Sequence, residues 1–520
     1  MQLETLDVTV RNYINDCIQK VEAEYKQRLT EAENKYLELK ERFDLAMYQK
    51  FARSAEQLPV DDKQQLLFTE EPEQVAQTDS STEEQSQEIK SYTRRKPGRK
   101  PIDPDLPRKE NIIDIPEAEK TCACGAEMSK IGEETSEKVE IIPPSMYVLK
   151  TVRPKYACRS CEGTEDEDKP AVRIAPVPPA IIPRSIASAS LLSYVMIQKY
   201  QDHLPFYRQE VQFQRIGIEI SRQDMSNWQQ QVYGKLKPLY ELLKETLKSG
   251  PVIQMDETTV QVMGEEGRSD TQKSYMWLAR GGPPEKIVVL YEYRKTRGGY
   301  HAKEFLGGYS GYLQTDGYNG YDKAVEGNSN IIHAGCFAHA RRKFFEASKI
   351  SKKPQSAEEG IKYIRKLYEL EGKLRKENME ENNFLVRRKK EAGLILSAFR
   401  LWLEKRVNEV LPSTLLGEAI GYTLNQWDKL VMYLESPYLT PGNNACENAI
   451  RPFVLGRKNW LFNKSPEGAE SSCGIYSLIE TAKQNGLEPL LYLRELFEKA
   501  PLVSTPEDWK KLLPWNIFTA

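Results

Sequence analysis

The sequence predicts an α/β core that is interrupted by an all-α insertion and preceded by long helical and cysteine-bearing segments. Strand-like runs rich in Val, Ile, Thr and aromatic residues follow one another from residue 251, which predicts a sheet. Charged helical sequence without strand runs then fills residues 355–440, which predicts the insertion. At roughly 150 residues per domain, the 520-residue chain is long enough for three or four domains.

The composition excludes several classes of protein. Lys and Arg number 74 against 76 Asp and Glu, and this balance excludes a uniformly basic protein that coats nucleic acid while allowing local basic patches. No run approaches the roughly 18 apolar residues that a membrane span needs, and the first residues lack the apolar core of a signal peptide. Eight cysteines are too few for a disulfide scaffold, so we expect a cytoplasmic protein without a membrane partner.

Residues 1–60 are expected to form a dimerising coiled coil. Between residues 14 and 48, apolar side chains recur with alternating spacings of four and three, without Gly or Pro. An amphipathic helix that packs on its own domain would show the same pattern, and this alternative stays open. The longest such run consists of Tyr25, Leu29, Ala32, Tyr36, Leu39, Phe43 and Ala46.

The charge changes sign between residues 61–93 and 94–110. The first stretch is acidic and polar, with nine Asp and Glu against one Lys in 61–89, which predicts a solvated linker. The second begins RRKPGRKP, and bases that flank Pro-Gly-Arg are typical of a hook that slides Arg into the minor groove of DNA. A solvated basic linker is the alternative. The bases expected at DNA are Arg94, Arg95, Lys96, Arg99 and Lys100.

Residues 111–170 are expected to form a small zinc-binding module. Two close cysteine pairs, CACG and CRSCEG, flank a β-rich stretch, and four thiolates fit one tetrahedral Zn²⁺. Reduced, buried cysteines are the alternative, because the CxC spacing of the first pair is less specific than CxxC. The expected zinc ligands are Cys122, Cys124, Cys158 and Cys161.

Residues 171–250 begin with a Pro-rich boundary and continue as helical sequence. The runs LPFYRQEVQFQR and SRQDMSNWQQQVYGKL, joined by a short turn, resemble a helix-turn-helix, whose second helix enters a major groove. Ser221 and Asp224 are spaced as a capping box at the start of that helix. We expect Arg222, Gln223 and Asn227 to contact DNA there, although many helical hairpins without this role look similar.

The order of elements from residue 251 is that of a known fold. Three strand candidates, PVIQMDETTVQV, SYMWLAR and KIVVLYEY, precede a helix, a fourth strand, a helix, a fifth strand and another helix. This is the order of the RNase-H-like fold. We therefore assign residues 251–354 to the first part of such a core, 355–440 to the insertion, 441–485 to the second part of the core and 486–520 to a C-terminal helical tail.

Three acids are candidates for one catalytic site. Asp256 lies in the middle of the first strand, where a charge is costly unless it binds something. Asp316 closes the fourth strand, which neighbours the first in this fold, and Glu447 lies on the helix after the insertion. Carboxylates that converge repel one another unless cations bind, and hard oxygen ligands select Mg²⁺ or Mn²⁺. The rivals are Glu257 and Asp322, and a lone Asp at a strand end is often only a turn residue.

Several blocks resemble the insertion-sequence-66 family of bacterial transposases, namely VIQMDETTVQV, LQTDGYNGYD, GCFAHARRKFFE, NNACENAIRPFVLGRKNWLF and IYSLIETAKQNG. CACG with KYACRSCEG is similar to the family's zinc-binding module. The resemblance covers nearly the whole chain and implies a DDE transposase, with Asp256, Asp316 and Glu447 as the triad that binds two Mg²⁺ or Mn²⁺ ions, and with one structural Zn²⁺ elsewhere. His333 departs from the pattern, which leads us to expect a non-ionisable or acidic residue there.

Basic residues near the acids are expected to contact the DNA backbone. One group lies at the start of the helix after the fifth strand, and the other follows Glu447 on its helix. For the first group, the alternative is a solvent-exposed helix face that does not contact DNA. The residues are His339, Arg341, Arg342, Arg451, Arg457 and Lys458.

The expected reaction has two steps. Water cleaves the 3′ ends of the element, and the freed 3′ hydroxyls then attack target DNA directly. We expect as partners the terminal repeats, target DNA, further copies of the chain in a homodimer or higher oligomer, and accessory proteins encoded by the same element, in the cytoplasm at the bacterial nucleoid. The alternatives are an RNase-H-like structure-specific nuclease, which cleaves without joining, and a zinc-dependent DNA-binding regulator without catalysis.

Overall fold

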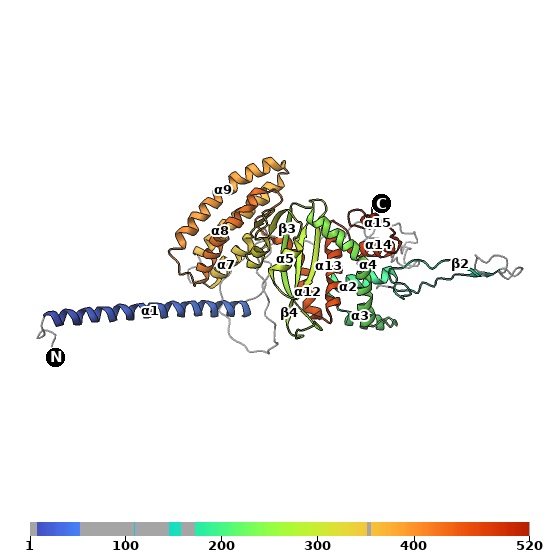
Figure 1. Cartoon of the computed structure of the whole chain (residues 1–520), viewed down its shortest axis with the longest axis horizontal. Helices are drawn as coiled ribbons and strands as arrows, with labels where there is room; N and C mark the ends of the chain where they lie inside the picture. Colours follow the sequence, from blue (N-terminus) through green and yellow to red (C-terminus); the bar gives the residue numbers. More distant parts are fainter. Residues whose placement is uncertain (1–7, 52–108, 110–144, 158–171, 351–354, 519–520) are drawn as a thin grey trace, which may run out of the picture. The chain divides into compact units, whose positions relative to one another are not determined.

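The computed structural model describes residues 8–51, 109, 145–157, 172–350 and 355–518 (Figure 1). The chain divides into two units, of which the first combines Met1–Glu73 with Pro178–Ala520 and the second is Gln74–Val177. Within the described residues, no helix is long and apolar enough to cross a membrane.

The second unit contains a small antiparallel ribbon. Strand β1 (Lys155–Ala157) pairs with β2 (Val172–Ile174), with Tyr156 opposite Arg173. The four expected zinc ligands and the basic hook at 94–101 lie outside the described residues, so the zinc site and the hook stay predictions.

Helix α1 (Val8–Phe51) is a single run of 44 residues. Its large apolar side chains form a stripe that stays exposed along the helix, and near its C-terminal end the Glu41 carboxylate accepts a hydrogen bond from the backbone N–H of Leu415 at 3.0 Å. An apolar stripe of this length is available to a partner helix. The stripe includes Tyr25, Leu29, Tyr36, Leu39 and Phe43, whose exposed fractions lie between 52% and 70%.

The helical segment before the sheet contains the expected helix, turn and helix. Helices α2 (Ala189–Tyr200) and α3 (Phe206–Arg215) precede the long helix α4 (Arg222–Lys248). The capping box at the start of α4 is present, because the Ser221 hydroxyl accepts from the Asp224 N–H and the Asp224 carboxylate accepts from the Ser221 N–H. The buried face of α4 packs against strand β5 (Val288–Arg294) and helix α13 (Pro466–Gln484), which joins this segment to the core.

A mixed sheet forms the centre of the first unit, in the order β5-β4-β3-β6-β7. The pairs β5–β4 and β4–β3 are antiparallel, whereas β3–β6 and β6–β7 are parallel. A short strand, β8, pairs in parallel with the C-terminal end of β3, and the sequence did not suggest it. The strands are β3 (Val252–Val262), β4 (Lys273–Gly281), β5 (Val288–Arg294), β6 (Gly311–Gln314), β7 (Ile331–Ala334) and β8 (Phe462–Asn463).

Helices cover the sheet, and one of them, α13, forms hydrogen bonds with the edge strand β5. The backbone N–H groups of Val289 and Tyr291 on β5 donate to the hydroxyls of Thr481 and Ser477 on α13, so polar groups of an edge strand are satisfied by a helix. These helices are α5 (Gly299–Phe305), α6 (Asn319–Val325), α7 (Phe337–Ile350), α12 (Asn444–Trp460), α13 (Pro466–Gln484), α14 (Pro489–Lys499) and α15 (Pro506–Lys511).

A helical bundle stands between α7 and α12 in the chain. It packs around an aromatic core of its own, to which Phe344 of α7 contributes with Phe399 and Trp402. In Figure 1 the bundle lies on the opposite side of the sheet from α2–α4. Its helices are α8 (Gln355–Lys376), α9 (Glu381–Arg406), α10 (Leu415–Asn425) and α11 (Trp427–Val431).

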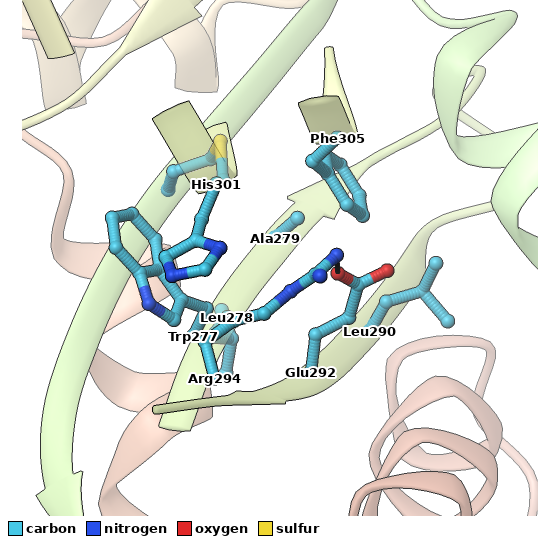
Figure 2. A pocket seen from close by; sticks show the side chains of 9 residues that line it. Trp277, Leu278, Ala279, Leu290, Glu292, Arg294, His301 and Phe305 are labelled. Carbon is cyan, nitrogen blue, oxygen red and sulfur yellow. Dashed lines mark hydrogen bonds and ion pairs between the residues drawn. The ribbon is translucent and has the colours of Figure 1, made fainter. Parts of the chain in front are cut away.

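A narrow cavity lies between the sheet and α5, and Figure 2 shows the side chains that line it. Trp277 and His301 stand at one end, and Glu292 lies beside Arg294, whose guanidinium is 2.8 Å from the Glu292 carboxylate. Its volume of about 10 Å³ holds about one water molecule, so it is too small for an organic ligand.

Candidate active site

The register of the sheet brings two of the three candidate acids to adjacent positions. Residues of β3 pair with residues of β6 at a constant offset of 60, as in Gln254 with Gln314. The Thr315 N–H still donates to the Ala334 carbonyl, so the chain remains extended after β6. The same offset sets Asp256 beside Asp316, and neighbouring strands lie about 4.8 Å apart.

The carboxylate of each aspartate accepts few hydrogen bonds to offset the cost of its burial. The carboxylate of Asp256 accepts from the Glu257 N–H at 2.8 Å, and that of Asp316 accepts from the Tyr318 N–H at 3.0 Å. Burial raises the pKa of Asp256 well above its usual range, and the charges of Glu257, Glu447 and Asp316 raise it further. Burial also raises the pKa of Asp316. Mutual repulsion of this kind is relieved when a cation binds.

Of the three acids, Glu447 is the one that is buried without any hydrogen bond to its carboxylate from the residues that the structure describes. It lies in the first turn of α12 with 1% of its surface exposed, and neither carboxylate oxygen has a hydrogen-bond partner among the described residues. The His339 Nδ1 and the Arg342 guanidinium are 3.7 and 3.8 Å away. Burial raises the pKa of Glu447 to about 7, an effect that Arg342 opposes and Asp316 increases.

The start of α12 is attached directly to the strand that bears Asp256. The Asn443 side-chain amide donates to the Met255 carbonyl at 3.0 Å, and the Asn443 backbone N–H donates to the Cys336 Sγ at 3.0 Å. Glu447 follows one helical turn later, so these two contacts place it next to the aspartates.

The polar atoms around Glu447 are of the types that bind a cation, but among the described residues the cluster with ligand-type atoms within 4.8 Å of one another does not include Asp256 or Asp316. Two orphaned carboxylate oxygens on Glu447 and the unpartnered, buried Nδ1 of His339 are polar atoms that a bound ion would satisfy. Within the described part of the chain, the ligand-type atoms of Cys336, His339 and Glu447 lie within 4.8 Å of one another. Burial raises the pKa of the Cys336 thiol to about 12, so the carboxylates are the better ligands, and they suit Mg²⁺ or Mn²⁺.

The two rival acids have protein partners. The Glu257 carboxylate is 2.6 Å from the Arg297 guanidinium and also accepts from the Tyr321 hydroxyl. Asp322 is 2.6 Å from the Lys429 ammonium and 2.9 Å from the His333 Nδ1. Each therefore has a cationic or imidazole partner within 2.9 Å, whereas the nearest such groups lie 3.7 and 3.8 Å from Glu447.

The sequence did not reveal what supports Asp316. The His333 Nε2 pairs with the Thr315 hydroxyl at 2.8 Å, and that hydroxyl donates to the Asp316 carbonyl at 2.9 Å. From the bundle, the Tyr422 ring reaches the loop after Asp316, where a Cβ on Gly317 would meet it at 2.8 Å. The unusual histidine at 333 was the one available signal for this support.

The side chains that the sequence predicts to contact DNA lie in three different surroundings. His339 and Arg342 face Glu447, and burial lowers the pKa of His339 to about 3, which keeps it neutral. Arg457 donates to the Thr258 and Thr259 hydroxyls of β3 at 3.2 and 3.0 Å.

The remaining side chains that were predicted to contact DNA lie nearer to solvent. Arg222, Gln223 and Asn227 are exposed at the start of α4, where the Gln223 amide donates to that of Asn227 at 2.9 Å. Lys458 is exposed, and Arg341 and Arg451 are half-buried. None of these positions establishes a DNA contact, so their role stays a prediction.

Comparison with known proteins identifies related sequences along most of the chain. The family described as "Transposase IS66 family" matches residues 184–471, and "IS66 C-terminal element" matches 477–515. The "zinc-finger binding domain of transposase IS66" matches 119–162, and "Transposase C of IS166 homeodomain" matches 38–110.

Relatives that match most of this chain occur in Sinorhizobium fredii (strain NBRC 101917 / NGR234). The uncharacterized protein y4qI is 32% identical over 471 residues, which is 87% of this chain and 85% of the relative. The uncharacterized protein y4hP is 29% identical over 488 residues, which is 89% of this chain and 84% of the relative. From the family matches and this coverage, the chain belongs to the IS66 family of DDE-type transposases.

Proposed function

We propose that this transposase cleaves the 3′ ends of its element and joins them to target DNA, using two divalent ions held by Asp256, Asp316 and Glu447. The observation that carries the proposal is the pair of orphaned, buried oxygens on Glu447 beside two aspartates of raised pKa. Buried acids with few partners destabilise a protein, and a bound cation would offset the cost of burying these three side chains.

In the first step the oxygen of a water molecule attacks the phosphorus at the element's end, and the bond to the 3′ oxygen breaks, which leaves a 3′ hydroxyl. In the second step that hydroxyl attacks a target phosphorus, the bond from that phosphorus to the target's 3′ oxygen breaks, and the leaving oxygen takes up a proton to become a new 3′ hydroxyl. The ions, when bound, lower the pKa of the attacking group and stabilise the leaving oxygen. Asp256, Asp316 and Glu447 would hold the ions, and Arg342, whose guanidinium is 3.8 Å from Glu447, would balance phosphate charge.

The proposed architecture is an RNase-H-like core with α8–α11 inserted between α7 and α12. The order β5-β4-β3-β6-β7, with three antiparallel strands followed by two parallel ones, supports this assignment. The separate aromatic core of the bundle supports its description as an insertion at residues 355–440.

The proposed binding modules precede this core in the sequence. The zinc-finger family match supports one Zn²⁺ on Cys122, Cys124, Cys158 and Cys161. The exposed apolar stripe of α1 supports a coiled coil between copies of the chain, which would pair two element ends. The capped start of α4 supports its entry into a major groove, and the basic hook at 94–101 would follow a minor groove.

A strand-transfer assay tests this function. Purified protein, DNA that carries the element's end and a supercoiled target plasmid should yield joined products only when Mg²⁺ or Mn²⁺ is added. Cleavage without joining would identify a nuclease instead, and binding without cleavage would identify a regulator. The Asp256→Asn variant serves as the negative control because it keeps the shape of the side chain.

A further inference from the structure

A buried chain of side-chain amides runs beneath the three acids. Gln254 on β3 and Gln314 on β6 are paired in the sheet register, with 6% and 0% of their surfaces exposed. The Gln254 amide donates to the Gln314 carbonyl oxygen at 2.9 Å. Each glutamine precedes a candidate metal ligand by two residues, and residues two apart share a face of an extended strand. The glutamine pair therefore lies directly beside Asp256 and Asp316.

The direction of this chain is fixed at both ends. At one end the Arg280 guanidinium, which can only donate, contacts the Gln254 oxygen at 3.2 Å. At the other end the Gln314 amide nitrogen donates to the backbone carbonyls of Thr440 at 2.6 Å and of Gly335 at 3.3 Å. Because carbonyls can only accept, neither glutamine can rotate its amide by 180° without losing these bonds.

Gln314 therefore contacts every segment that carries a group of the proposed site. Its own strand leads to Asp316, its oxygen faces the strand of Asp256, and Gly335 leads to His339 at the start of α7. Thr440 leads to Glu447, through a segment that is joined again to α7 by the Phe337 N–H, which donates to the Pro441 carbonyl at 2.9 Å.

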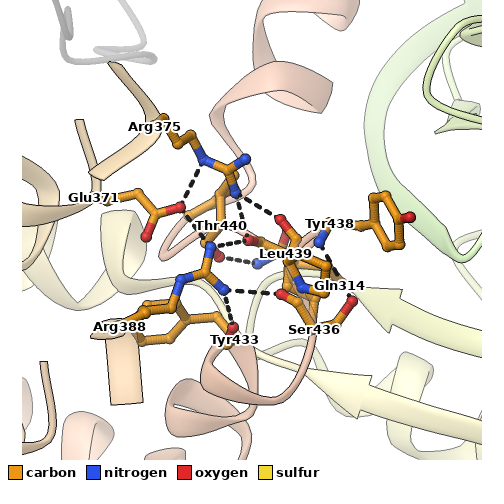
Figure 3. A network of polar contacts seen from close by, with 11 residues as sticks. Gln314, Glu371, Arg375, Arg388, Tyr433, Ser436, Tyr438, Leu439 and Thr440 are labelled. Carbon is orange, nitrogen blue, oxygen red and sulfur yellow. Dashed lines mark hydrogen bonds and ion pairs between the residues drawn. The ribbon is translucent and has the colours of Figure 1, made fainter. Parts of the chain in front are cut away.

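The segment before Thr440 is held in turn by the helical bundle, as Figure 3 shows. The fully buried Arg388 donates to the carbonyls of Tyr433 at 2.6 Å, Ser436 at 2.8 Å and Leu439 at 3.0 Å, and its charge is paired with Glu371 at 2.6 Å. A buried guanidinium with all these acceptors leaves the backbone little freedom. Gln314 thus joins a rigid anchor in the bundle to the sheet.

We propose that Gln314 is a positioning residue that sets the separation of Asp256, Asp316 and Glu447 and thereby the affinity of the site for divalent cations. This inference rests on the proposed function. Mg²⁺ requires near-ideal octahedral geometry, so a change in ligand spacing lowers affinity even when every ligand is present. Residues that orient metal ligands typically change metal affinity about 10–100-fold when they are replaced.

The test is Mn²⁺ binding to the full-length, zinc-loaded protein, measured by titration calorimetry without DNA. The matched control is Gln229→Met, because Gln229 is similarly buried at 2% exposure and donates through its amide to the Ser471 hydroxyl, and the two residues lie on α4 and α13 rather than on the elements that bear the acids. Binding that is lost in the Asp256→Asn, Asp316→Asn double variant defines the site. Gln314→Met and Gln229→Met should both lower the thermal midpoint, but only Gln314→Met should raise the Mn²⁺ Kd, by about tenfold.

An unchanged Mn²⁺ Kd in folded Gln314→Met would overturn the inference, because a purely structural glutamine affects stability alone. If Gln314→Met does not fold, Gln254→Met decides, since it removes one of the three contacts of Gln314. A raised Kd then supports the inference, and an unchanged Kd rejects it. If the wild-type protein itself binds no Mn²⁺ at the acids, the proposed function fails instead.

Discussion

Replacing Glu447 by Gln should stabilise the metal-free protein at neutral and alkaline pH while it abolishes catalysis. The substitution keeps the shape of the side chain and removes one charge. In the wild-type protein that charge is 99% removed from solvent, with neither oxygen hydrogen-bonded among the described residues. A carboxylate in such a place favours its protonated form, and a glutamine side chain resembles that form.

The magnitude follows from the pKa of Glu447, which burial raises from 4.5 to about 7. Each pKa unit corresponds to about 1.4 kcal/mol, so ionisation costs the folded state about 3 kcal/mol. Below pH 4.5 the side chain is protonated in both states and the cost is absent. As the pH rises from 4.5 to 7 the unfolded chain loses its proton first, so folded-state stability falls and then levels off above pH 7.

The assay is the thermal midpoint of the metal-free wild-type and Glu447→Gln proteins between pH 5 and pH 8. The midpoints should be similar at pH 5, and the variant should be the more stable protein at pH 8. Saturating Mg²⁺ should then raise the midpoint of the wild-type protein alone. Cleavage by the variant should fall by at least about 10³-fold, because the acids act as one unit.

Glu435→Gln is the matched control, because Glu435 is about half exposed and pairs with Lys389 on the surface at 2.6 Å. This variant should shift stability by less than about 1 kcal/mol and keep full activity. If Glu447→Gln were less stable than the wild-type protein at pH 8, Arg342 would outweigh the cost of burying the ionised carboxylate, and the account of a destabilised ligand would be wrong.

Asp256→Asn and Asp316→Asn should each abolish cleavage and joining, non-additively, while gel-shift affinity for end DNA is kept or increased; normal cleavage by both would refute the mechanism. The Mg²⁺ concentration for half-maximal cleavage should fall as the pH rises from 6 to 8, since a protonated Glu447 cannot bind metal, and a flat profile would contradict this. Cys122→Ser should remove zinc, measured by elemental analysis, and unfold the module at 111–170, whereas protein purified without chelator that already lacks zinc would exclude the site. Deleting residues 1–50 should lower the number of chains per particle, measured by light scattering. An unchanged number of chains would show that α1 packs internally.

Sequence patterns predicted the elements that have strong local signals. The alternation and β-branched content of 251–294 predicted three strands, and β3, β4 and β5 occupy that stretch. Ser221 and Asp224 predicted a capped helix, and the capping box is present. These features depend on nearby residues, so a single sequence carries them.

Features that depend on tertiary contacts were beyond reach. Strand β8 is two residues long and exists only because it pairs with the end of β3. Gln254 and Gln314 look like ordinary polar residues until the register pairs them, and Tyr422 meets Gly317 only after the bundle has packed. Arg457 was expected at DNA because of its charge, yet its hydrogen bonds to β3 are set by the approach of α12.

The most direct test of the central claim is anomalous diffraction from crystals of the full-length protein soaked in Mn²⁺. The account predicts manganese peaks beside the carboxylates of Asp256, Asp316 and Glu447, and their loss in crystals of Asp256→Asn. Manganese bound only beside Cys336 and His339, or absent from this region at saturating concentration, would contradict the claim that the three acids form one metal site.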